Sequence, residues 1–202
     1  MSEENPWQHL ASHTVFENPW IRLRRDEVIR PDGAPGQYGV VEFRSWAIGV
    51  VPVTPEGDTY LVGQWRYTLG YYSWEIPEGG GPFHETPLQA AQRELREETG
   101  IEASRWTYLG ELSTSNSVTN EIGCVFLAEG LSYGAAEPEG TERLQVRRVP
   151  LREAYEMAMT GEIADGLAVI GLARAWHHLQ SGRSLRPYAR SFPGLGEPTP
   201  GR

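Results

Sequence analysis

The chain has 202 residues, which is enough for one domain with a sizeable core and an added N-terminal element. A net charge of -9 and a pI near 5.1 argue against a nucleic-acid-binding surface and against binding to an anionic membrane. The single cysteine, Cys124, excludes an internal disulfide framework, and no apolar run approaches the roughly 20 residues of a membrane span. The acidic N-terminus also lacks the regions of a signal peptide, so we expect a cytoplasmic protein without nucleic-acid or membrane partners.

Alternating and apolar runs separated by turn residues predict strands on both sides of one central helix. In chain order, we expect strands at 20–30, 38–43, 45–53, 59–65, 105–112, 122–131 and 144–150, and helices at 87–99, 151–160 and 161–179. The strands at 45–53 and 59–65 flank the turn sequence PEGD and are expected to form a hairpin. Mixed elements of this kind indicate an α/β sandwich rather than a doubly wound sheet. We divide the chain into an N-terminal strand region (1–45), a main domain (46–180) and a flexible tail (181–202).

The central helix is predicted from local signals at both of its ends. Thr86, Pro87 and Gln89 read as an N-cap, a first-turn proline and the far half of a capping box. Gly100 stands where a left-handed helix stop is expected. The helix is therefore expected over 87–99, with a buried stripe made of Leu88, Ala91 and Leu95.

This helix carries a cluster of glutamates within a longer spaced pattern. The pattern consists of Gly79, Glu85, Arg93-Glu94-Leu95, Glu97-Glu98 and Gly100-Ile101. A random sequence of average composition would match it from a given starting position with odds on the order of one in 10⁸. Glu94, Glu97 and Glu98 fall on one arc of the helix, where a divalent cation would offset their mutual repulsion. Magnesium accepts carboxylate and phosphate oxygens, and Arg93 can hold a carboxylate by a forked ion pair. The alternative, a solvated charged face, fits an isolated acidic run better than this complete pattern.

The pattern resembles, position for position, the signature of the Nudix hydrolases, which cleave nucleoside diphosphates linked to another moiety. From about residue 14 to 180, the stretches FENPWIRLRRDEV, YGVVEF, GQWRYTLG and WEIPEGG are similar to the ADP-ribose and nucleotide-sugar pyrophosphatase branch. The resemblance implies a Nudix-type α/β/α sandwich with a mixed sheet, with 46–180 as the Nudix domain. It also implies a homodimer with exchanged N-terminal strands.

The resemblance further assigns roles to individual residues. Metal ligands would be Glu94, Glu97 and Glu98, together with a backbone carbonyl at the glycine run, placed at Gly79. Arg66 matches the arginine that contacts the pyrophosphate, and Glu75 matches the glutamate of WEIPE. A downstream loop glutamate, Glu142 first and Glu139 second, would hold metal or deprotonate the attacking water. Either could instead be a solvated loop residue.

Two features bear on specificity. Trp20 and Tyr67 lie in segments expected to border the site and could stack on a base or sugar, although aromatic residues more often pack in a core or interface. Asn116 stands where ADP-ribose hydrolases often have a proline. This departure concerns ADP-ribose specificity and leaves nucleoside diphosphate sugar chemistry unaffected.

Taken together, the sequence predicts a magnesium-dependent pyrophosphatase that converts nucleotide-sugars such as ADP-ribose into a nucleoside monophosphate and a sugar phosphate. Manganese fits the same oxygen ligands. Glu97 and Arg93 belong to the predicted catalytic set, with Glu142 or Glu139 as the base. Two alternatives stay open: a hydrolase of dinucleotides or other nucleotides, and a sensor that binds a nucleotide-sugar without cleaving it.

Overall fold

The computed structural model describes residues 4–136 and 143–182. The chain forms two compact units. The first contains the residues up to Ser45 and the segment Ser113–Glu121, and the second contains Trp46–Leu112 and the residues from Ile122 onward. The predicted tail lies outside the described residues from position 183 on.

The first unit is built on a three-stranded antiparallel sheet in the order β1-β2-β3. Its strands are β1 (Gln8–Glu17), β2 (Ile21–Ile29) and β3 (Pro35–Phe43). A turn connects β1 to β2, and the Asn18 side chain stabilises it by accepting hydrogen bonds from the backbone amides of Trp20 and Ile21 at 2.9 and 2.8 Å. The segment Ser113–Glu121 contacts β3, because the amide of Val41 donates to the carbonyl of Val118 at 2.8 Å.

The second unit contains two sheets and three helices. One sheet has the order β7-β4-β9-β8 and the other has the order β10-β5-β6. Their strands are β4 (Ser45–Pro52), β5 (Asp58–Arg66), β6 (Tyr71–Glu75), β7 (Glu78–Pro82), β8 (Ile101–Ser113), β9 (Ile122–Tyr133) and β10 (Gln145–Pro150). The helices are α1 (Pro87–Thr99), α2 (Leu151–Thr160) and α3 (Gly166–Ser181). β4 and β9 run parallel while β5 pairs antiparallel with β6 and β10, which makes the strand arrangement mixed.

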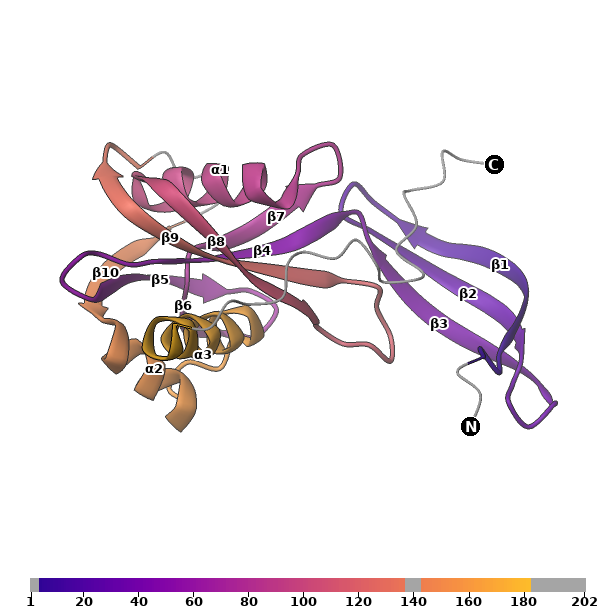
Figure 1. The fold of residues 1–202 in the computed structure, drawn as a ribbon. Coiled ribbons are helices and arrows are strands. Elements are labelled where there is room, and N and C mark those ends of the chain that lie inside the picture. The colour runs from indigo at the N-terminus through magenta and orange to yellow at the C-terminus, as the bar shows by residue number, and fades with distance from the viewer. Residues whose placement is uncertain (1–3, 137–142, 183–202) are drawn as a thin grey trace. The chain divides into compact units, whose positions relative to one another are not determined.

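Helices cover the strands of this unit on two sides (Figure 1). Alternate residues of β9 divide between two cores, since successive side chains of a strand point to opposite faces. Cys124 and Phe126 pack in the core that contains Ala90, Ala91 and Leu95 of α1. Val125 and Leu127 pack in the core formed with α2 and α3. The layers are therefore α1, strands, and α2 with α3, which confirms the predicted α/β/α sandwich.

Several local expectations were wrong. The strands at 45–53 and 59–65 do not form a hairpin: they belong to different sheets, and only an isolated bridge from Val53 to Thr59 joins them. The last helix begins at Gly166, where Asp165 caps it, instead of at 161. β1 and the two short strands β6 and β7 were not predicted. Leu88 is 37% exposed because it lies in the first turn, and the buried face of α1 is formed instead by Ala90, Ala91, Glu94, Leu95 and Glu98.

Candidate active site

Helix α1 begins and ends where its local signals predict. The Thr86 hydroxyl accepts a hydrogen bond from the amide of Gln89 at 3.2 Å, and the Gln89 side chain accepts one from the amide of Thr86 at 2.9 Å. Gly100 follows the last turn with a φ of 70°, in the left-handed region. The amide of Gly134, just past β9, donates to the Gly100 carbonyl at 2.7 Å. Both ends of the helix that carries the glutamates are thus fixed.

The three motif glutamates of α1 differ in their exposure. Glu94 and Glu98 are buried, with 9% and 3% of their surface exposed, whereas the Glu97 side chain is 24% exposed. Carboxylates are rarely buried in proteins unless a cation or hydrogen-bond donors compensate their charge. The helix face predicted to bind metal is therefore half sequestered from water.

Arg93 connects these carboxylates to the loop that precedes the helix. Its Nη1 donates to Glu94 at 2.7 Å and to Glu97 at 3.0 Å. Its Nη2 donates to the backbone carbonyl of Gly80 at 2.7 Å and to Glu85 at 3.1 Å. Burial lowers the pKa of Arg93, but its hydrogen bonds to Glu85, Glu94 and Glu97 outweigh this effect and raise the pKa, so the guanidinium stays charged. One side chain thereby orients two motif glutamates and the loop.

The glycine run approaches α1 closely. A Cβ placed on Gly79 would lie 2.6 Å from Oε1 of Glu94 and closer still to Cδ and Oε2, so no larger residue fits without moving that carboxylate. The amide of Glu78 donates to Oε2 of Glu98 at 3.0 Å. The backbone at residues 78–79 thus lies against the carboxylates of α1.

A second charged group lies at the ends of β5 and β6. The two strands pair so that Val62 faces Glu75, and Arg66 ends β5. Arg66 donates from Nε to both oxygens of Glu75, at 2.9 and 3.1 Å, and from Nη2 to Glu75 at 2.6 Å. The same Nη2 donates to Glu78 at 2.9 Å. Burial lowers the pKa of Arg66, but the hydrogen bonds to Glu75 and the charges of Glu75 and Glu78 raise it by more. The pKa therefore lies above its usual value, and the guanidinium keeps its charge.

Asp165, at the N-terminus of α3, completes this group. One carboxylate oxygen from each of Glu75, Glu78 and Asp165 lies within 4.8 Å of the other two. Asp165 also caps α3, because its Oδ2 accepts the amide of Ala168 at 2.8 Å. Burial, followed by the negative charges of Asp165 and Glu75, raises the pKa of Glu78 well above its usual range, against the opposing effect of Arg66. Three acidic groups and one arginine therefore share a poorly solvated region.

Sequence comparisons identify the family of this chain. The nucleoside diphosphate sugar hydrolase N-terminal domain matches residues 7–41, and the NUDIX domain matches residues 44–167, which is more than half of the chain. The chain belongs to the Nudix family.

Individual relatives agree with this assignment to the Nudix family. The ADP-ribose pyrophosphatase of Mycobacterium tuberculosis is 34% identical over 176 residues, which cover 84% of this chain and 83% of the relative. The ADP-ribose pyrophosphatase of Bacillus subtilis is 34% identical over 158 residues, covering 77% and 85% of the two chains. A solved ADP compounds hydrolase has the same fold, with a TM-score of 0.77 over 89% of this chain and 98% of that chain at 21% identity. The predicted family and fold are confirmed.

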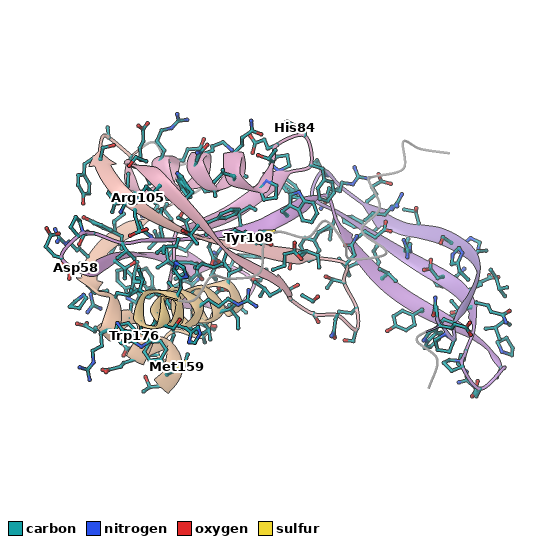
Figure 2. The ribbon with its side chains drawn as sticks, viewed as in Figure 1. Asp58, His84, Arg105, Tyr108, Met159 and Trp176 are labelled. Carbon is teal, nitrogen blue, oxygen red and sulfur yellow. The ribbon has the colours of Figure 1, made fainter. Side chains whose placement is uncertain are left out.

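The remaining predicted site residues of this Nudix protein lie in both units or outside the described residues. Tyr67 follows β5 and is 94% exposed, and Trp20 is 72% exposed in the first unit. Glu139 and Glu142 lie outside the described residues. His84, which was not predicted as a site residue, is exposed in the turn between β7 and α1, where Figure 2 labels it. The stacking and base roles predicted for these residues stay predictions.

Two residues of the charged group, Glu78 and Asp165, were not predicted as site residues. Glu78 stands directly before the glycine run of the Nudix motif, so its position gave a usable signal. Asp165 had only a capping signal, an aspartate before an apolar helix. Its proximity to Glu75 depends on how α3 packs, and no local pattern encodes that.

The residues present fit the divalent metal that a Nudix hydrolase uses. Glu94, Glu97 and Glu98 supply the carboxylate oxygens that Mg²⁺ and Mn²⁺ prefer. The backbone of Gly79 lies close to the Glu94 carboxylate, in space that a Cβ would fill.

Among the described residues, no helix is long and apolar enough to cross a membrane.

Proposed function

We propose that this Nudix enzyme hydrolyses the pyrophosphate bond of nucleoside diphosphate sugars, with ADP-ribose-like compounds first among them, in a Mg²⁺-dependent reaction. Products are a nucleoside monophosphate and a sugar phosphate. The observation that carries this proposal is the complete set of motif carboxylates on α1, of which Arg93 holds Glu94 and Glu97 while the backbone at Gly79 lies against Glu94. The activities named for the relatives from M. tuberculosis and B. subtilis support the same substrate class, as the sequence predicted.

The carboxylates of Glu94, Glu97 and Glu98 and the backbone at Gly79 would hold the metal. When bound, a divalent ion neutralises charge on the diphosphate and lowers the pKa of a coordinated water. Arg93 fixes the orientation of Glu94 and Glu97 before substrate arrives, so little reorganisation is needed during the reaction. Glu142, or Glu139 as second choice, accepts the proton of the attacking water.

Arg66 steadies the diphosphate. Glu75 and Glu78 occupy its Nε and Nη2, and within the described part of the chain Nη1 donates no hydrogen bond to a protein acceptor. The Arg66 side chain is 33% exposed, whereas that of Glu75 is 2% exposed. Glu75 therefore acts on substrate by positioning the guanidinium, and Nη1 supplies the donors for a phosphate oxygen. Tyr67 and Trp20 offer exposed rings for a base or sugar.

The sensor alternative is weaker because binding without turnover does not require the full carboxylate set. Glu94, Glu97 and Glu98 are all present, and two of them are held by Arg93. Hydrolysis of a dinucleotide or another nucleotide uses the same metal carboxylates, so only a substrate comparison separates it from the proposal.

Turnover of a substrate panel tests the proposal. ADP-ribose, ADP-glucose and GDP-mannose are compared with a nucleoside triphosphate and a dinucleoside polyphosphate, with and without Mg²⁺. Glu97→Gln should abolish release of monophosphate, and Glu102→Gln, which changes an exposed glutamate, is the matched control. Binding of nucleotide-sugars without turnover at any metal concentration would contradict the enzyme and leave the sensor.

We further assign a homodimer to this chain, with residues 1–45 as the exchanged element and the cytoplasm as its location. Within the first unit, large apolar side chains on β1 and beside it are exposed, namely Trp7, Leu10, Val15 and Phe16. A second copy that pairs with this sheet would cover them. Light scattering behind a sizing column measures the mass, and a single-chain mass at micromolar concentration would contradict the dimer.

A further inference from the structure

The group made by Glu75, Glu78 and Asp165, here called the acidic triad, has no metal-binding role in the reaction described above, in which Glu75 and Glu78 only orient Arg66. Its members come from three places: the end of β6, the start of β7 and the N-cap of α3. One oxygen from each lies within 4.8 Å of the other two. Segments distant in sequence thus place three hard oxygen donors around one point.

The charge of the acidic triad is not balanced by its arginine partner. Arg66 supplies one positive charge against three carboxylates, which leaves two negative charges if all are ionised. The side chains of Glu75 and Glu78 are only 2% and 8% exposed, so water solvates them poorly. Buried carboxylates in this situation need a further cation or a proton.

A second observation points to a ligand. Oε2 of Glu78 is buried, and no hydrogen-bond donor among the described residues reaches it. Oε1 of the same carboxylate accepts a hydrogen bond from Arg66, so the orphan oxygen, Oε2, is the one that Arg66 does not contact. A buried acceptor without a donor is destabilising unless a ligand satisfies it. A water would satisfy the oxygen but would not compensate the charge. Without a cation, the hydrogen bond between the Glu78 and Asp165 side chains requires a shared proton, which a bound cation would displace.

We propose that Glu75, Glu78 and Asp165 form a divalent cation site separate from the glutamates of α1. A larger ion needs less contraction of the triad: three oxygens spread evenly around Mg²⁺, with bonds of about 2.1 Å, are about 3.6 Å apart, whereas around Ca²⁺, with bonds of about 2.3–2.6 Å, they are about 4.0–4.5 Å apart. Oxygens within 4.8 Å of one another can therefore bind Ca²⁺ with little movement. The ion would take the orphan oxygen of Glu78 as one ligand and balance the two excess charges.

A cation in the acidic triad also changes what Arg66 can do. Glu75 and Glu78 now hold its Nε and Nη2. An ion that neutralises these carboxylates weakens their hold, so that the guanidinium can turn more of its donors toward a diphosphate. This consequence rests on the proposed function, whereas the site itself does not.

Calorimetric titration with Ca²⁺ alone, on the full chain without nucleotide, tests the site. A Glu94→Gln/Glu97→Gln background removes two carboxylates of α1 and should still bind one equivalent of Ca²⁺. Adding Asp165→Asn, which keeps a side-chain oxygen able to cap α3, should weaken that equivalent at least about tenfold by removing one ligand charge. Glu78→Gln should do the same, and Glu162→Gln, an exposed change three residues before Asp165, should not.

The proposal is overturned if the background variant binds no Ca²⁺, or if Asp165→Asn and Glu78→Gln bind it as the background does. If the background variant does not fold, the comparison is made directly, and Asp165→Asn should bind one of the wild-type equivalents of Ca²⁺ at least about tenfold more weakly. Because no nucleotide is present, the result is independent of turnover. A chain that binds Ca²⁺ at the triad but hydrolyses nothing would sink the proposed function alone.

Discussion

Gly79→Ala tests how tightly the glycine run and the motif helix fit together. The added Cβ would lie 2.6 Å from Oε1 of Glu94 and closer still to its Cδ. Carbon atoms in unstrained contact are roughly 3.5 Å apart. The carboxylate must then retreat by about 1 Å. A displacement of that size in a catalytic group costs about 10²-fold in turnover, equivalent to about 2.7 kcal/mol of transition-state stabilisation.

Stability should change less than activity in this variant. The Glu94 carboxylate is the far end of a flexible side chain, so the main loss is its 2.7 Å hydrogen bond from Arg93, worth no more than about 1–2 kcal/mol at this partly exposed position. Gly81→Ala should show the opposite balance, because its Cβ would lie 2.9 Å from the Cβ of Ala90 and overpack the core. Gly39→Ala, which meets nothing within 4 Å, is the neutral control.

The assay is kcat at saturating nucleotide-sugar over a Mg²⁺ titration, with thermal unfolding measured on the same samples. Gly79→Ala should need more Mg²⁺ for half-maximal rate and reach a lower plateau. Wild-type turnover and Mg²⁺ dependence in a folded Gly79→Ala protein would show that the position of Glu94 does not matter to the reaction, and the reasoning would be refuted.

Four further outcomes follow from the described contacts. Arg93→Lys should lower kcat about 10²-fold at unchanged substrate KM, because an ammonium cannot contact Glu85, Glu94 and Glu97 together; steady-state kinetics checks this. Arg66→Lys should instead raise KM for nucleotide-sugars, measured in the same way, since the bidentate contact that orients it is lost. Burial raises the pKa of Cys124 to about 12, so the thiol should resist iodoacetamide at pH 8 until the chain is unfolded, as mass spectrometry can follow. Because the unfolded thiol loses its proton first, Cys124 should lower the unfolding free energy by about 1.4 kcal/mol per pH unit between about pH 9 and pH 12. In chemical denaturation Cys124→Ala should lose this share of the slope and keep the share of Tyr60 and Tyr108, whose pKa values burial also raises.

The sequence predicted most reliably what is encoded locally. The bounds of α1 were predicted correctly because Thr86, Pro87, Gln89 and Gly100 determine both ends within a few residues. The helix at 151–160 was likewise predicted with its observed limits. The spaced motif indicated the family because its residues lie in one helix and in the segments next to it, so their spacing can be read directly from the sequence.

What the sequence did not predict depends on contacts between distant segments. Nothing local indicates that β4 pairs with β9, 70 residues further on, so the turn between β4 and β5 suggested a hairpin that does not exist. The same limit applies to the acidic triad, because Asp165 meets Glu75 and Glu78 only through the packing of α3. Leu88 was assigned to the core by its periodicity, but a first-turn residue can lie beyond the edge of the layer it would pack on.

Gly100 has a further role in the geometry of the chain. A Cβ at this residue would lie 2.5 Å from the backbone oxygen of Gly134, and the two glycines are joined by a hydrogen bond, so the segment that leads to Glu139 and Glu142 starts from the end of α1. A larger residue at position 100 would have to displace the backbone of Gly134 to Ala136, so the last turn of the motif helix and the end of β9 can shift only together. A residue that stops a helix thus also couples that helix to the strand that divides the two cores.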